Sequence, residues 1–147
     1  MYESYTHQAV PSKRYRELLG TALCVFNSNN SFVIENILNK DTNRKYSWYE
    51  LIDKTSGQLE DAIKVTITQA SDEKIANTFK DLYLIRNRIM HGYQVTAEMD
   101  LPGDDAKQIL ATKYKNGYQE YITEEFLMNF IKKNDEFAAM LEEFRRR

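Results

Sequence analysis

The segment LIRNRIMHGY, residues 84–93, holds the side chains best suited to proton transfer and anion binding: Arg86, Asn87, Arg88, His91 and Tyr93. An imidazole titrates near neutral pH, so it can take up or give off a proton. A guanidinium stays charged and can give a phosphate two parallel hydrogen bonds. The only other histidine, His7, lies in a weakly patterned N-terminal stretch. This segment is therefore the candidate functional site.

The helical phase of these residues decides which of them can act together. At about 100° per residue, Asn87 and His91 share one helix face, and Arg86 and Tyr93 share a neighbouring face. Arg86 and His91 are separated by about 140° around the helix axis. They cannot both hold one small ligand from the middle of an isolated helix. The spacing favours a site at a helix end, or at a seam between two helices or two subunits.

Arg86 continues an apolar stripe formed by Ile75, Phe79 and Leu82 at helical spacing. A guanidinium at a core position is costly unless it is paired, and arginine does not escape the cost by losing its proton. Either a carboxylate or another buried acceptor meets Arg86, or the stripe opens into a polar cleft.

The residues from Arg86 to His91 read R-N-R-I-M-H and resemble the R-x4-6-H signature of the HEPN superfamily. The polar Asn87 directly after the arginine is also typical of that family. Gly92 and Tyr93 complete the variant R-x4-H-x-Y, which is similar to that of HepT-like toxins. The position of the motif, late in a long helix of a small helical chain, strengthens the resemblance.

The resemblance implies a metal-independent endoribonuclease that acts as a toxin or phage-defence effector. RNA carries its own nucleophile, the 2′-hydroxyl, so neither a cofactor nor a metal is expected. His91 would be the general acid or base, Arg86 would hold the phosphate in the transition state, and Asn87 would orient His91 or the phosphate. Arg88 and Tyr93 are candidate binding residues. The expected products are a 5′-hydroxyl and a 2′,3′-cyclic phosphate.

The resemblance also predicts partners. One histidine cannot easily act as acid and base at once, and the family brings two motifs into one cleft by dimerisation. We therefore expect a two-fold homodimer with Arg86 and His91 near the axis. Tyr93 has two interpretations: it covers the core below the motif, or a nucleotidyltransferase-type antitoxin attaches AMP to it, as in HepT-like toxins. The alternative function is a non-catalytic HEPN domain that binds nucleotide or RNA, or that only dimerises.

Composition limits the remaining possibilities. The 147 residues suit a single domain, residues 1–147, with 42% hydrophobic and 29% charged residues. The net charge of −2 argues against binding nucleic acid mainly by general attraction, but permits a local basic cleft. No apolar run approaches the roughly 20 residues of a membrane span, and the N-terminus lacks a secretory signal. The single cysteine, Cys24, is expected to be buried, and the cytoplasm is the predicted compartment.

Apolar periodicity predicts an all-α fold, an antiparallel bundle of about four helices with a small β-hairpin before the last one. The predicted helices run from 13 to about 38, from 48 to 68, from 71 to about 91, and from 124 onward. Residues 1–10 are expected to be loosely attached. The asparagine-rich patch at 27–31 either breaks the first helix or faces the Arg86 cleft.

The hairpin prediction rests on alternation at residues 111–115 and 118–122 around Asn116-Gly117, a strong turn signal. Because the hairpin follows the motif in sequence, it either flanks the site as a lid or dimer contact, or is an insertion without a role there.

Overall fold

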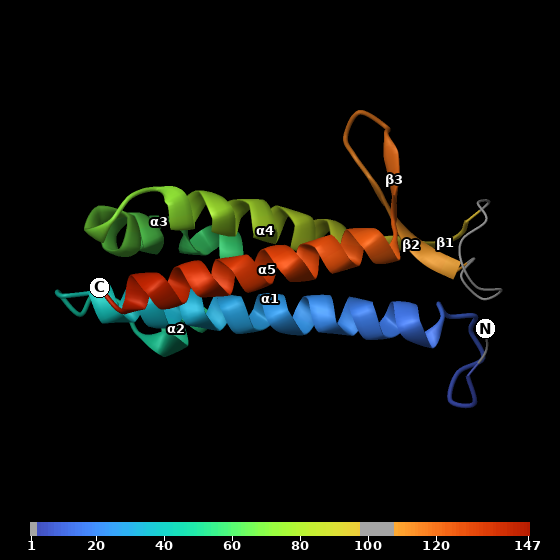
Figure 1. Ribbon diagram of the computed structural model, residues 1–147, viewed down its shortest axis with the longest axis horizontal. Helices are drawn as coiled ribbons and strands as arrows, with labels where there is room; N and C mark the ends of the chain where they lie inside the picture. The colour runs from blue at the N-terminus through green and yellow to red at the C-terminus, as the bar shows by residue number, and fades with distance from the viewer. Residues whose placement is uncertain (1–2, 98–107) are drawn as a thin grey trace.

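The computed structural model describes residues 3–97 and 108–147. Three long helices lie side by side along the molecule (Figure 1): α1 (Lys13–Lys40), α4 (Lys74–Met90) and α5 (Glu124–Arg145). Between α1 and α4 the chain forms four short pieces, namely α2 (Trp48–Ile52), the 3-10 turn η1 (Ser56–Leu59), α3 (Glu60–Ile63) and the π-helical turn η2 (Lys64–Thr68).

A three-stranded antiparallel sheet lies at one end of the helices. Its strands are β1 (Tyr93–Thr96), β2 (Gln108–Lys113) and β3 (Gln119–Ile122), in the spatial order β1-β2-β3. The β2–β3 hairpin projects away from the helices (Figure 1). Gly117, at the tip, has a φ of 89°, a left-handed conformation that glycine adopts without strain.

The predicted fold class was wrong. The described residues form five α-helices and a three-stranded sheet, not an all-α bundle of about four helices with a two-stranded hairpin. Strand β1 escaped prediction because it is only four residues long, is mostly exposed and directly follows the end of α4. The second predicted helix is divided because Thr55 and Gln58 form a capping box that starts a new turn.

Stacked phenylalanine rings form the centre of the core. Phe26 of α1 lies 6.0 Å from Phe79 of α4 and 6.2 Å from Phe130 of α5, between ring centroids. Phe79 also lies 5.9 Å from Phe137 of α5. All four rings are almost fully buried, so they join the three long helices through one continuous aromatic contact.

The asparagine-rich patch does not break α1, and Asn29 and Asn30 hydrogen-bond to residues other than Arg86. Helix α1 is continuous through it. The buried Asn29 amide nitrogen donates to the backbone oxygen of Asn134 on α5 at 2.8 Å and to its side-chain oxygen at 3.0 Å. Asn30 accepts a hydrogen bond from Ser56 at 2.7 Å. Low helix propensity is outweighed here because the amides satisfy buried partners on neighbouring elements.

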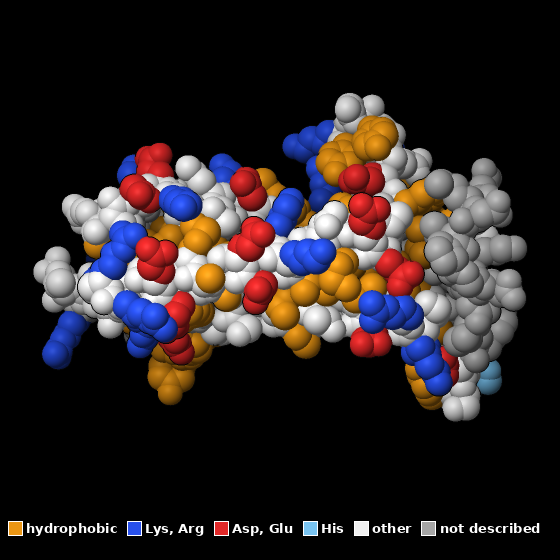
Figure 2. Space-filling model, viewed as in Figure 1, with side chains coloured by type: hydrophobic (Ala, Val, Ile, Leu, Met, Phe, Trp, Pro, Cys, Tyr) orange, Lys and Arg blue, Asp and Glu red, His pale blue; other side chains and the backbone are white. Residues whose placement is uncertain are grey.

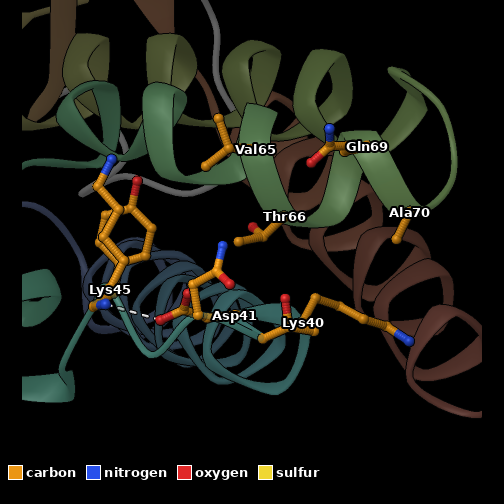
Figure 3. Close-up of a pocket in the computed structure, with 10 residues that line it drawn as sticks. Lys40, Asp41, Lys45, Val65, Thr66, Gln69 and Ala70 are labelled. Atoms are coloured by element: carbon orange, nitrogen blue, oxygen red, sulfur yellow. Dashed lines mark hydrogen bonds between the residues drawn. The ribbon is translucent and has the colours of Figure 1, made fainter.

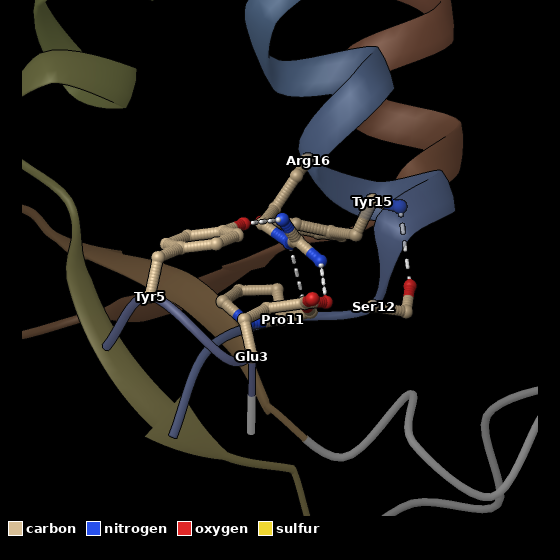
Figure 4. Close-up of polar contacts among 6 residues, drawn as sticks. All are labelled: Glu3, Tyr5, Pro11, Ser12, Tyr15 and Arg16. Atoms are coloured by element: carbon tan, nitrogen blue, oxygen red, sulfur yellow. Dashed lines mark hydrogen bonds and ion pairs between the residues drawn. The ribbon is translucent and has the colours of Figure 1, made fainter. Parts of the chain in front are cut away.

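The N-terminal segment is held more firmly than predicted. Arg16 of α1 donates to Glu3 at 2.5 Å, to the Tyr5 hydroxyl at 2.8 Å and to the Pro11 carbonyl at 2.9 Å (Figure 4). One guanidinium therefore ties three points of the preceding segment to the first turn of α1.

Two further expectations concern the surface. Cys24 is exposed on α1, although the apolar run around it predicted burial. In the described part of the chain, no helix has the length and apolar character needed to cross a membrane.

Tyr15 fixes the sheet to the helices. Its ring is 2% exposed, and its hydroxyl donates to the Ile122 carbonyl of β3 at 2.6 Å. The same hydroxyl accepts a hydrogen bond from the Leu110 backbone N–H of β2 at 3.1 Å. Burial raises the pKa of Tyr15 to about 12. A protonated hydroxyl therefore links α1 to the base of the projecting hairpin.

Replacing this hydroxyl is expected to destabilise the fold. Tyr15→Phe removes the partner of the buried Ile122 carbonyl and of the part-buried Leu110 N–H, which costs about 1–3 kcal/mol in the free energy of unfolding. In the native protein, stability from this group is full below pH 10 and is lost as pH rises toward 12, because the unfolded chain gives up the proton first. Urea unfolding from pH 8 to pH 11 should show the difference between the two proteins shrinking. An unchanged difference across this range would contradict the assignment.

Candidate active site at the end of helix α4

Helix α4 ends where the candidate residues lie. The His91 backbone N–H donates to the Asn87 carbonyl at 3.0 Å, and the Gly92 N–H donates to the Ile89 carbonyl at 3.1 Å. A Cβ at position 92 would lie only 3.1 Å from the Ile89 oxygen and 3.2 Å from the Ile122 side chain. Glycine has no Cβ, so Gly92 lets the chain turn tightly here. The turn leaves the His91 side chain exposed at the helix end.

Four of the five predicted residues line one cavity of about 580 Å³ between α4 and the β2–β3 hairpin. Asn87 and His91 line it from the same helix face, as their four-residue spacing predicted. Arg88 and Tyr93 line it as well, and the remaining wall is formed by Leu84, Ile85, Thr112, Lys113, Tyr114 and Phe126. The end of α4 and strand β2 therefore contribute four polar side chains to the lining of this cavity: an imidazole, a guanidinium, an amide and an ammonium group.

Arg86 does not line this cavity. Its Cζ atom lies 4.8 Å from the centre of the Phe26 ring, and its Nε donates to the Asn87 side-chain oxygen at 3.1 Å. Burial lowers the pKa of Arg86, but an arginine remains protonated. Among the described residues no carboxylate lies within 4.0 Å of this guanidinium. The cost of burying its charge is therefore offset by the Phe26 ring, by the Asn87 amide and by partial exposure to solvent.

Asn87 connects the two groups that the motif separates. Its side-chain oxygen binds Arg86, and its side chain lines the cavity that His91 lines. Within one protomer, then, Asn87 binds the Arg86 guanidinium and lines the cavity that His91 lines, whereas Arg86 does not line it. The divergence of about 140° predicted from the sequence accounts for this.

Tyr93 lies in β1, not on the helix, because α4 ends at Met90. The helical argument that placed it beside Arg86 therefore does not apply. Its side chain is 38% exposed, so it does not cover the core. Its hydroxyl donates to the Gln119 side chain of β3 at 2.6 Å, which directs the ring across the sheet.

Lys113 and Tyr114 of the hairpin were not predicted as site residues. The Arg88 guanidinium donates to the Lys113 carbonyl at 2.9 Å and lies 3.8 Å from the centre of the Tyr114 ring. The Tyr114 hydroxyl donates to Glu120 at 2.8 Å, and this hydrogen bond raises the pKa of Tyr114. The sequence signal nearest to these residues was the turn at Asn116-Gly117. That signal predicts a hairpin but does not indicate that the hairpin packs against α4.

A second cavity, of about 430 Å³, lies near the other end of the molecule between the end of α1 and η2 (Figure 3). Lys40, Asp41, Lys45 and Thr66 are among its lining residues, and no histidine or cysteine is. The Asp41 carboxylate accepts the Tyr46 backbone N–H at 2.8 Å, so it stabilises the loop. In the described ranges, no three histidine, cysteine or acidic side chains group so that they could hold a metal ion.

Comparison of this chain with protein-family models, with curated proteins and with solved structures finds no match. The R-x4-H motif and the geometry around it are therefore the features that point to a function.

The Arg86 side chain offers a test of whether it serves the fold or a site. Because Arg86 is partly desolvated and has no carboxylate partner among residues 3–97 and 108–147, Arg86→Met should change the free energy of unfolding by no more than about 1 kcal/mol. Leu82→Ala, one turn earlier and 1% exposed, should cost about 2–5 kcal/mol. Chemical denaturation of both variants measures the difference. A loss of more than 3 kcal/mol in Arg86→Met would assign the guanidinium a structural role.

Proposed function

We propose that this chain is a metal-independent endoribonuclease of the HEPN type, a cytoplasmic toxin or phage-defence effector. The observation that carries the proposal is the cavity at the end of α4, where exposed His91 lies beside Asn87, Arg88 and Lys113. Asn87 in turn holds the Arg86 guanidinium. A titratable group and several fixed hydrogen-bond donors are the minimum that cleavage of a phosphodiester requires.

The chemistry needs no group beyond these side chains and RNA. The 2′-oxygen forms a bond to phosphorus while the bond from phosphorus to the 5′-oxygen breaks. A base takes the 2′-hydroxyl proton, and an acid gives a proton to the departing 5′-oxygen. His91 performs one of these transfers in each protomer. Arg86 and Asn87 donate hydrogen bonds to the non-bridging oxygens as negative charge develops on them.

A homodimer completes this site. In one protomer Arg86 does not line the cavity that contains His91. A two-fold axis near the end of α4 would bring the guanidinium of one protomer toward the imidazole of the other, and would supply the second histidine. Leu84 and Met90 on α4 are large apolar side chains that are 49% and 58% exposed beside the motif. Burying them against a second copy would favour association.

Cleavage in the presence of EDTA tests the activity. The native protein should convert single-stranded RNA to fragments ending in a 5′-hydroxyl and a 2′,3′-cyclic phosphate. His91→Ala and Arg86→Ala should each lower the rate by roughly 10²–10⁴-fold, the range for a proton-transfer group or a transition-state donor. His7→Ala removes the other histidine, exposed on the N-terminal segment, and should leave the rate unchanged. Equal residual activity in the native protein and both motif variants would reject the nuclease.

Light scattering at micromolar concentration tests the dimer. The native protein should have twice the chain mass of 17.3 kDa. Leu84→Asp should give a monomer, because a buried carboxylate opposes association. Val65→Asp is the matched control, since Val65 has the same 49% exposure on η2, far along the sequence from the motif, and it should remain dimeric. A native protein that is monomeric at this concentration contradicts the shared site.

The competing function is phosphate or nucleotide binding without cleavage, and one observation favours it: Arg86 lies outside the cavity of its own protomer. RNA binding without any cleavage would select this function. In either case the exposed Tyr93 hydroxyl is the candidate target of a nucleotidyltransferase-type antitoxin, with an antitoxin of another type as the further possibility. Addition of AMP would replace its hydrogen bond to Gln119 and fill the mouth of the cavity.

A further inference from the structure

The projecting hairpin carries a group of aromatic and basic side chains, here called the hairpin arm: Lys113, Tyr114, Lys115 and Tyr118. The Tyr114 and Tyr118 rings lie 5.6 Å apart at 35° to each other. Tyr118 is 60% exposed and Lys115 is exposed. Figure 2 shows basic and apolar side chains next to one another on the hairpin, away from the helices.

The hairpin arm is fixed relative to His91. Arg88, on the motif helix, contacts the Tyr114 ring at 3.8 Å and donates to the Lys113 carbonyl at 2.9 Å. Lys113 and Tyr114 line the same cavity as His91. The backbone of the arm closes on itself, because the Tyr114 N–H donates to the Tyr118 carbonyl at 2.8 Å. A ligand held by the arm would therefore lie at a defined place beside the imidazole.

Two of the three segments that line this cavity contain no acidic residue, although the whole chain has 22 acidic and 20 basic residues; the third, at the start of α5, has Glu124 and Glu125 before the lining Phe126. Neither residues 84–97 nor residues 108–119 contain an aspartate or a glutamate, and together they contain Arg86, Arg88, Lys113 and Lys115. The nearest acid along the hairpin, Glu120, accepts a hydrogen bond from Tyr114. Cationic side chains therefore gather in a chain that is acidic overall, as expected for a local anion site.

We propose that the hairpin arm is the subsite for an unpaired nucleotide of single-stranded RNA, with its base stacked on Tyr118 and the flanking phosphates on Arg88, Lys113 and Lys115. This inference rests on the proposed function of the neighbouring cavity and specifies its substrate. A base in a duplex stacks on its neighbours, so only an unpaired base presents a face to an exposed tyrosine. A protein partner fits less well, since the cores of protein interfaces are depleted in lysine.

Binding is measured separately from cleavage by placing every variant on a His91→Ala background. Fluorescence anisotropy with an end-labelled single-stranded RNA should show that Tyr118→Ala weakens binding roughly tenfold. Tyr118→Phe keeps the ring and should bind as the parent does. Tyr49→Ala, which removes a tyrosine that is 83% exposed on α2, is the control and should have no effect. A fully paired duplex of the same sequence should bind more weakly than the single strand.

The basic side chains are tested by salt. The double variant Lys113→Gln and Lys115→Gln should reduce the slope of log affinity against log salt by roughly 1.4, since each phosphate contact contributes roughly 0.7 in single strands. Lys113→Gln keeps the backbone carbonyl that Arg88 contacts, so the arm stays in place.

The outcomes separate this inference from the nuclease proposal. If the native protein cleaves RNA but Tyr118→Ala binds the single strand as tightly as Tyr49→Ala does, the nuclease stands and the hairpin subsite is rejected. If the native protein cleaves nothing but Tyr118→Ala loses affinity for the single strand, the subsite stands and the nuclease is rejected. Equal affinity for the single strand and the duplex, or no RNA binding at all, also rejects the subsite.

Discussion

The stacked rings of Phe26, Phe79, Phe130 and Phe137 are the contact on which the remaining structure depends. They join α1, α4 and α5, and so they fix the position of the last turn of α4 relative to the other two helices. Arg86 extends this contact, because its guanidinium lies against the Phe26 ring. The most buried part of the fold and the candidate site are thus connected through one aromatic face. An aromatic face attracts a guanidinium, and no carboxylate from the part of the chain that the structure describes neutralises this one.

Most of the site comes from two elements of different character, and Tyr93 of β1 and Phe126 of α5 complete the lining. Helix α4 supplies Asn87, Arg88 and His91 with the regular spacing of one helix face, while the hairpin supplies Lys113 and Tyr114. Tyr15 holds the base of the hairpin to α1, and Arg88 holds its arm to α4. The cavity therefore has two walls whose relative position is set by specific side-chain contacts. This arrangement explains how a small, mostly helical chain can present a shaped polar space outside its core.

Local patterns predicted the parts of this structure that depend on nearby residues. The first and last helices begin at the predicted residues 13 and 124, directly after the capping side chains of Ser12 and Thr123. Asn87 shares a face with His91 because a four-residue spacing requires it. What depends on distant contacts was missed. The pairing of β1 with β2 joins segments separated by residues 97–107, and the hydrogen bonds from Asn29 to Asn134 span 105 positions. Neither pairing leaves a periodic trace in the sequence, so β1 went unpredicted and the asparagine patch was misinterpreted.

The space around Gly92 has a consequence for how the site can be inactivated. Any side chain at this position would press on the Ile89 carbonyl and on the Ile122 side chain, which belong to α4 and β3. Relief would come from a shift between the helix end and the sheet, the two bodies that form opposite walls of the cavity. A single added methyl group could thus misalign the pocket while every polar group in it stays chemically intact. In an activity assay, a substitution at Gly92 would resemble the loss of a catalytic residue, although its cause would be a change in the shape of the pocket.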